Sequence, residues 1–221
     1  MEIDFYRTCK FSFINTAVGD VLRAIDGKSL MGSMILSFCI IDYMAQVTNG
    51  KWSGTRQDFK NYVINQLGDL NPRYKSLSEE MYAIRNSLIH SYGESDSTHR
   101  LNLQFLFSID DFRDSHLDLG SIDSGLIMRF DLPKLIAEIV VSVISFFELN
   151  KANDALFEEW YLRKIKVNDY AFFHKRDILP TDKTFPYQEI HSSLALFNEI
   201  DYNNEVAIDR YSDVIRAICK R

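Results

Sequence analysis

The chain has 221 residues, enough for one domain with a substantial core or one domain with an appendage. Hydrophobic residues make up 46% and charged residues 25%, the proportions of an ordinary soluble globular protein. The net charge of −6 disfavours loose, non-specific adhesion to nucleic acid but does not exclude a local basic pocket. We expect reduced thiols in a cytosolic protein, because three distant cysteines lack CxxC spacing: Cys9, Cys39 and Cys219.

The sequence predicts neither a signal peptide nor a membrane span. Glu2 and Asp4 are acidic where a secretory signal has basic residues. The longest apolar runs, at 34–41 and 139–147, are interrupted by serines and are too short to cross a bilayer. We therefore expect a cytoplasmic protein without membrane contact.

Hydrophobic periodicity predicts a series of helices in the first part of the chain. Apolar residues recur at helical spacing over 4–25. The stretch 29–47 is apolar nearly all round, which is typical of a central helix. A third helix is expected over 55–67, followed by a break at 68–72 and a fourth helix over 76–93.

The fourth helix carries signals at both ends. Ser76 and Glu79 have capping-box spacing, and Gly93 suits the position after the last turn. Between these ends, one apolar stripe is expected to be buried: Met81, Ile84 and Leu88.

A cation, an amide and an imidazole project from a flank of this helix. Arg85 and His90 differ by roughly 140° around the axis and about 7.5 Å along it, and Asn86 shares a face with His90. By spacing alone these residues have a structural interpretation. A histidine is favoured at a helix C-terminus by the dipole, and an arginine commonly forms a surface ion pair.

The segment around these residues reads I-R-N-S-L-I-H-S-Y-G. It resembles the signature of the HEPN superfamily of small helical proteins, in which an Arg, usually followed by a polar residue, precedes a His near a helix end. The stretch S-M-I-L-S-F-C-I-I-D-Y-M-A is similar to the apolar helix that packs beside the motif helix in such proteins. The resemblance covers approximately 29–93.

The resemblance implies a metal-independent endoribonuclease without a cofactor, whose two motifs meet across a homodimer interface. Cleavage would leave a 2′,3′-cyclic phosphate. Arg85 would then bind and stabilise the phosphate, His90 would act as general acid or base, and Asn86 would orient one of them. Two copies of the motif would supply a base and an acid together.

Other HEPN relatives imply an alternative. Many lack activity and serve as binding or dimerisation modules, which here means a module for a nucleotide, an RNA or a protein. Some belong to toxin–antitoxin or antiviral defence systems, in which an antitoxin-type partner masks the site.

Asp42 is an acidic residue within the apolar stretch 29–47. A carboxylate buried there without a partner costs several kcal/mol. Either Asp42 lies on an exposed strip of the helix, or it pairs with Arg85 and orients the guanidinium for a phosphate. The sequence leaves both alternatives open.

Period-two alternation over 101–109 predicts a strand, and 125–130 is a candidate partner. Together they suggest a two-stranded hairpin or a small sheet. The acidic link between them, which contains His116, lacks the glycine of a calcium loop and the paired histidines of a zinc site. We therefore interpret the link as a solvated loop without a metal.

The last part of the chain predicts more helices. Asp131 suits an N-cap for a long helix to about residue 149, and another helix is expected over 155–167. Beyond it lies a small basic cluster at 174–176. Two short helices are then expected, at 191–200 and 205–218.

The expected fold is thus mainly α. A HEPN-like helical bundle would occupy 1–150 and include the β-hairpin near 101–130. A helical C-terminal extension, 151–221, would pack on that bundle.

Overall fold

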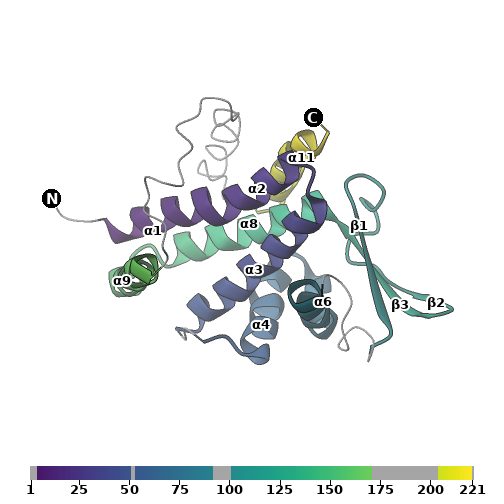
Figure 1. The fold of residues 1–221 in the computed structure, drawn as a ribbon, viewed down its shortest axis with the longest axis horizontal. Helices are drawn as coiled ribbons and strands as arrows, with labels where there is room; N and C mark the ends of the chain where they lie inside the picture. The colour runs from purple at the N-terminus through teal and green to yellow at the C-terminus, as the bar shows by residue number, and fades with distance from the viewer. Residues whose placement is uncertain (1–3, 51–52, 92–100, 171–203, 221) are drawn as a thin grey trace.

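The structure is a computed structural model that describes residues 4–50, 53–91, 101–170 and 204–220 (Figure 1). It is mainly helical and has one small three-stranded sheet at one end of the helices. The prediction of a mainly α fold with a small β element is confirmed in these terms.

The N-terminal helix is continuous but contains one wider turn. It runs as α1 (Phe5–Phe13), a π-helical turn (Ile14–Val18) and α2 (Gly19–Asp26), which matches the predicted helix over 4–25. Its buried face consists of residues at helical spacing: Cys9, Phe13, Ile14, Val18, Val21, Leu22 and Ile25.

Helix α3 (Leu30–Thr48) lies at the centre, as its apolar sequence predicts. It packs against α2, α8 and the helices that follow it in the chain. Among the described residues, α3 is the one helix long and apolar enough to cross a membrane, by length and composition alone. Half of that window is buried inside the protein, a property that the core helix of a soluble protein shares. The absence of membrane contact therefore stays a prediction.

The segment after α3 matches the prediction of a helix over 55–67. It comprises α4 (Arg56–Tyr62) and a π-helical turn (Val63–Leu67). A capping box starts α4, because Thr55 Oγ1 accepts from the Asp58 amide while the Asp58 carboxylate accepts from the Thr55 amide.

The start of the motif helix differs from the prediction. A short helix α5 (Gly68–Leu70) and a 3₁₀ helix (Pro72–Ser76) precede α6 (Ser78–Ser91). Ser76 therefore ends one helix instead of capping the next, and its hydroxyl donates to the Arg73 carbonyl at 3.0 Å.

The predicted capping box at Ser76 and Glu79 is wrong. Glu79 lies in the first turn of α6 and accepts bonds from Arg56 and Lys60 of α4. Pro72 favours the early 3₁₀ turn because its ring fixes φ at a helical value. The other proposed end of the helix, Gly93, lies outside the described residues.

The sheet contains β1 (Leu103–Ser108), β2 (Leu119–Ile122) and β3 (Gly125–Asp131) in the order β1-β3-β2. Strand β1 pairs in parallel with β3, and β2 pairs with β3 antiparallel. Of the two alternatives, a small sheet is therefore correct, and the hairpin between 101–109 and 125–130 is wrong. Alternation predicts that a strand exists but carries no information about its direction.

A glycine is required where β3 begins. Gly125 has φ +137°, and a Cβ atom at this position would lie 2.2 Å from the Asn102 carbonyl oxygen. This close approach lies directly before the first pair of β1 and β3, in which Leu103 faces Leu126.

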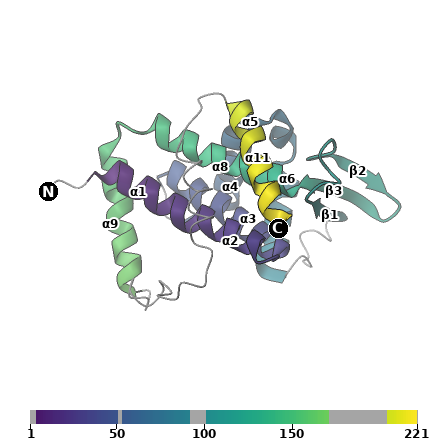
Figure 2. The same cartoon turned by 90° about the horizontal axis from the view of Figure 1, so that it is seen from above.

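The later helices complete the core. They are α8 (Leu132–Leu149), α9 (Asp154–Tyr170) and α11 (Asn204–Cys219). Figure 2 shows α11 lying over α8 and α2, while α9 lies against α1 at the other end, in agreement with the contacts. The boundary at residue 150 stays a prediction, and the segments 174–176 and 191–200 lie outside the described residues.

Asp131 occupies the N-cap position of α8 as predicted, but its side chain makes no capping bond. The carboxylate instead accepts from Arg216 Nη2 of α11 at 2.7 Å, and both side chains are buried. The residue that begins α8 therefore also ties α11 to it.

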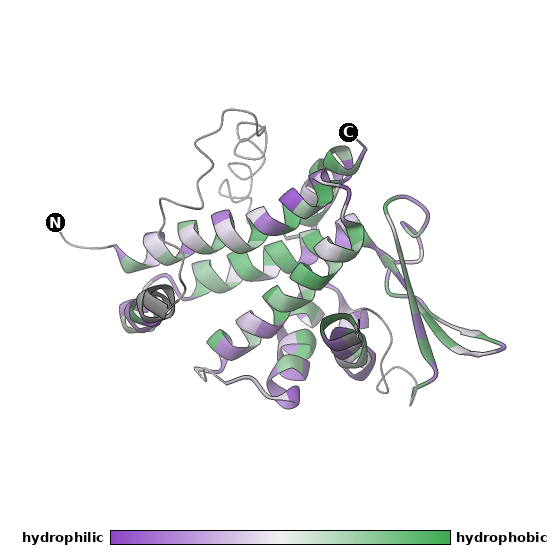
Figure 3. Ribbon diagram, in the orientation of Figure 1, coloured by the Kyte–Doolittle hydropathy of each residue, from purple (hydrophilic) through white to green (hydrophobic). Residues whose placement is uncertain are grey.

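Hydrophobic residues concentrate along α3 and α8, as the colouring of Figure 3 shows. At the C-terminal end of α8, Phe147 stacks on Trp160 with a centroid distance of 5.2 Å and on Phe157 at 5.7 Å. These aromatic contacts anchor α9 to the bundle.

Substitution Phe147→Ala is expected to lower the free energy of unfolding by about 3–5 kcal/mol, because Phe147 is completely buried. Leu149→Ala, on the same helix, is a matched control with an 82% exposed side chain and should change it by less than about 0.5 kcal/mol. Urea denaturation followed by circular dichroism measures both. Equal losses would contradict this packing.

Candidate functional site

Helices α3 and α6 bring the predicted site residues together. Arg85 Nη2 donates to Asp42 Oδ2 at 2.6 Å, and Arg85 Nη1 donates to Asn86 Oδ1 at 2.9 Å. Of the two alternatives for Asp42, the structure shows the pairing with Arg85. The side chains are partly accessible, with 17% of Arg85 and 26% of Asp42 exposed.

The local reason for this pairing is the apolar packing on either side of it. Met81, Ile84 and Leu88 form the buried stripe of α6, as predicted. Arg85 follows Ile84 directly and so lies at the margin of that stripe, where α3 presents Asp42. Neither charge could lie there alone without a desolvation penalty.

His90 lies in the last turn of α6 and is exposed. Its Nε2 atom lies 3.5 Å from Arg85 Nη1, at the outer limit of a hydrogen bond. A guanidinium only donates, so a hydrogen bond between the two side chains needs an unprotonated Nε2. At 3.5 Å the imidazole lies beside the cationic group without a well-formed bond to it.

Asn86 bonds Arg85 and makes no bond to His90. The sequence suggests that Asn86 orients either Arg85 or His90. The observed contact supports the first of these roles, orienting Arg85. Asp42 and Asn86 together fix both terminal nitrogens of the guanidinium.

Cys39 lies one turn before Asp42 on α3 and is exposed. Partial burial of the thiol and, next, the charge of Asp42 raise the pKa of Cys39, and Arg85 only partly opposes them. The thiol is therefore protonated near neutral pH, and Cys39 supplies no thiolate nucleophile to this site.

Comparisons with known proteins do not identify the chain: no protein-family model, curated protein or solved structure matches it. Within the described residues, no group of three or more His, Cys, Asp and Glu side chains is arranged to hold a metal ion. A function for this chain therefore follows from the site residues and the chemistry of their side chains.

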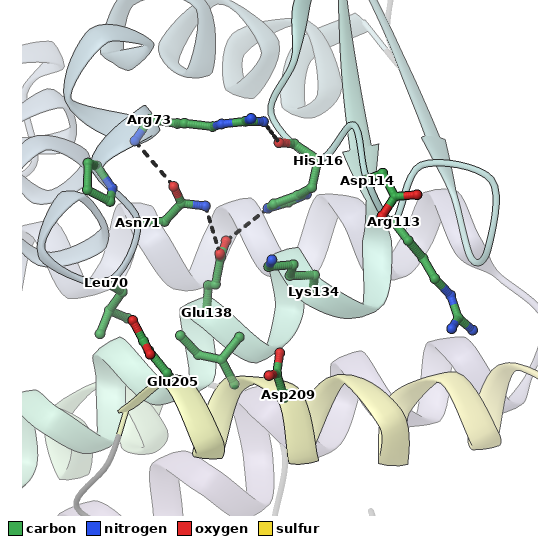
Figure 4. Close-up of a pocket in the computed structure, with 12 residues that line it drawn as sticks. Leu70, Asn71, Arg73, Arg113, Asp114, His116, Lys134, Glu138, Glu205 and Asp209 are labelled. Carbon is green, nitrogen blue, oxygen red and sulfur yellow. Dashed lines mark hydrogen bonds and ion pairs between the residues drawn. The ribbon is translucent and has the colours of Figure 1, made fainter.

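A second polar cluster lies elsewhere in the fold and was missed by the sequence analysis (Figure 4). Glu138 of α8 accepts from three side chains: Asn71 Nδ2 at 3.0 Å, Tyr74 Oη at 2.6 Å and His116 Nε2 at 2.9 Å. Only 1% of Glu138 and 3% of His116 is exposed.

The protonation of this cluster follows from its bonds. The Asp131 backbone N–H donates to His116 Nδ1 at 3.1 Å, so Nδ1 carries no proton. The proton is on Nε2, which donates it to Glu138. His116 is therefore a neutral imidazole, and Glu138 carries the negative charge.

The pKa values of the two acidic groups of this cluster shift in opposite directions. Burial alone would raise the pKa of Glu138, but the hydrogen bonds from His116, Tyr74 and Asn71 outweigh it and lower that pKa. The pKa of Tyr74 is raised far above its usual value, first by burial and then by the charge of Glu138. Glu138 is thus ionised and Tyr74 is protonated at neutral pH.

The sequence contained one signal for this cluster. Glu138 is a charged residue in the apolar face of α8, the helix that Asp131 precedes. In the same way, Asp42 is a charged residue in the apolar helix α3. The interpretation of the link around His116 as a solvated loop is wrong for that residue, because the histidine is buried against Glu138 and Phe130.

Substitution Glu138→Gln should lower the free energy of unfolding at neutral pH by about 1–3 kcal/mol, because an amide nitrogen would face donors that now bind an oxygen. The folded-state pKa of Glu138 is lowered, so the carboxylate contributes stability above its ordinary value of 4.5 and loses it as the pH falls. The difference between the variant and the original protein should therefore shrink below that pH.

Urea denaturation at a series of pH values measures this effect. Glu158→Gln is the control, because Glu158 is exposed on α9 and should show no such difference. A penalty for Glu138→Gln that is independent of pH would contradict the assignment of charge.

Proposed function

We propose that the protein is a metal-independent endoribonuclease of HEPN type that acts as a homodimer in the cytoplasm. The observation that carries this proposal is the guanidinium of Arg85, held by Asp42 and Asn86, with an exposed imidazole nitrogen of His90 at 3.5 Å. The Arg-Asn-x3-His sequence that resembles the HEPN signature supports it.

In this proposal the unprotonated Nε2 atom of His90 leaves its long contact with Arg85 and takes the proton from the ribose 2′-hydroxyl. The 2′-oxygen then attacks the adjacent phosphorus, and the 5′-oxygen leaves with a 2′,3′-cyclic phosphate as product. Arg85 stabilises the charge that develops on the phosphate oxygens. Asp42 and Asn86 position Arg85 and do not touch the substrate.

The reaction also needs an acid for the leaving 5′-oxygen, and His90 cannot be base and acid in the same step. A second copy of α6, related by a two-fold axis, would supply that acid through its own His90. The exposure of His90 at the end of α6 is compatible with such an arrangement.

One observation favours a second candidate, a non-catalytic binding or dimerisation module. Both terminal nitrogens of Arg85 already bond groups of the same chain. An arginine with these bonds holds α3 and α6 together. The exposed His90 would then contact a nucleotide, an RNA or a protein partner of antitoxin type, and no reaction would be catalysed.

The test is incubation of purified protein with RNA in EDTA. We expect fragments with 2′,3′-cyclic phosphate ends, and His90→Ala should reduce the cleavage rate by at least about 100-fold. Arg85→Lys should also reduce it, because lysine keeps the charge but loses the planar fork that Asp42 and Asn86 hold.

Arg56→Ala is the matched control. Arg56 is an exposed cation that contacts the first turn of α6 through Glu79, so its removal alters the charge near that helix without touching the site. Cleavage should persist in this variant. Undiminished cleavage in His90→Ala and Arg85→Lys would overturn the site, and absence of cleavage with intact RNA binding would favour the second candidate.

A further inference from the structure

A cavity of about 420 Å³ opens on the side of the molecule where the Glu138 cluster lies (Figure 4). Its walls come from the segment between α5 and the 3₁₀ helix, the loop before β2, helix α8 and helix α11. This volume is within the range of small-molecule sites. No residue of the candidate nuclease site lines it.

Two cations of the cavity wall already have acidic partners outside the cavity. Arg73 donates to Asp118 at 2.6 Å, and Arg113 donates to Asp110 at 2.7 Å. These pairs leave Lys134 as the cation to consider. It is half-buried, and within the described residues no carboxylate lies within 4.0 Å of its ammonium group.

The opposite wall is acidic. Asp209 lies on the exposed side of α11, where it faces the cavity across from α8, and it forms no ion pair with any described residue. Glu138 lies at the floor of the cavity, and its carboxylate accepts from the neutral donors Asn71, Tyr74 and His116. Among the described residues that line the cavity, Lys134 is therefore the cation without an acidic partner, and Asp209 and Glu138 carry negative charge.

This distribution of charge selects the ligand. A simple cation would be repelled by Lys134, and a simple anion would be repelled by Asp209 and Glu138. A molecule with an ammonium and a carboxylate group would satisfy both walls at once.

We propose that this cavity binds a small zwitterion of the size of a free amino acid, with its carboxylate on Lys134 and its ammonium group on Asp209. Leu70, Pro72 and Ile208 supply apolar surface for the remainder of the ligand. The proposal is independent of the nuclease activity.

Isothermal titration calorimetry with each of the common amino acids tests the proposal. We expect at least one of them to bind, and its matched amine and matched carboxylic acid, each lacking one charge, to bind at least about tenfold more weakly. Asp209→Asn and Lys134→Met should each weaken binding of that amino acid by at least about tenfold.

Asp213→Asn is the control, because Asp213 is exposed one turn further along α11 and does not line the cavity. It should bind as the original protein does. The proposal is overturned if no amino acid binds at about 10 mM, if the amine or the acid alone binds equally well, or if Asp209→Asn retains full affinity. Asp209 is exposed, so its variant reports on binding even if Lys134→Met fails to fold.

Discussion

The ion pair between Asp42 of α3 and Arg85 of α6 determines where the candidate site lies. Both helices are held by apolar packing, and each contributes one charge at the margin of that packing. Because a partly buried charge is costly without its partner, the pair constrains the register of α6 against α3. That register places Asn86 and His90 beside the guanidinium and leaves the imidazole exposed.

Asp42 and Glu138 are carboxylates of the two most apolar helices, α3 and α8, and the protein stabilises them in different ways. Asp42 is partly exposed and binds a cation, whereas Glu138 is fully buried and accepts from neutral donors. The difference follows from depth. Near the surface a charged partner remains partly solvated, while at depth three neutral hydrogen bonds stabilise one charge without the cost of burying a second.

The two clusters also differ in what they offer to other molecules. The bonds of Glu138 connect Asn71, Tyr74 and His116 from separate segments, and the two ring nitrogens of His116 are both occupied. That cluster is a structural anchor beneath a cavity. The imidazole of His90, by contrast, is exposed and has only a long contact to Arg85, so another molecule can reach it.

The sequence by itself determined most of the helices, because period and composition are local properties. The expected spans of the first helices, of α3 and of α8 agree with the structure to within a few residues, and the motif helix and its buried stripe were predicted as well. The charge of Asp42 in an apolar helix left two alternatives open, exposure or pairing with Arg85, and the structure shows the pairing. The helices could be predicted because their periodicity needs only neighbours along the chain.

Only the tertiary structure decided which residues far apart in sequence meet. The parallel pairing of β1 with β3 depends on the placement of β2, and alternation carries no information about direction. The first turn of α6 meets α4 through bonds from Arg56 and Lys60 to Glu79, residues 19 to 23 positions apart in the sequence. His116 was assigned to a solvated loop because its partner lies 22 residues away, and that hydrogen bond forms only when α8 packs against the loop.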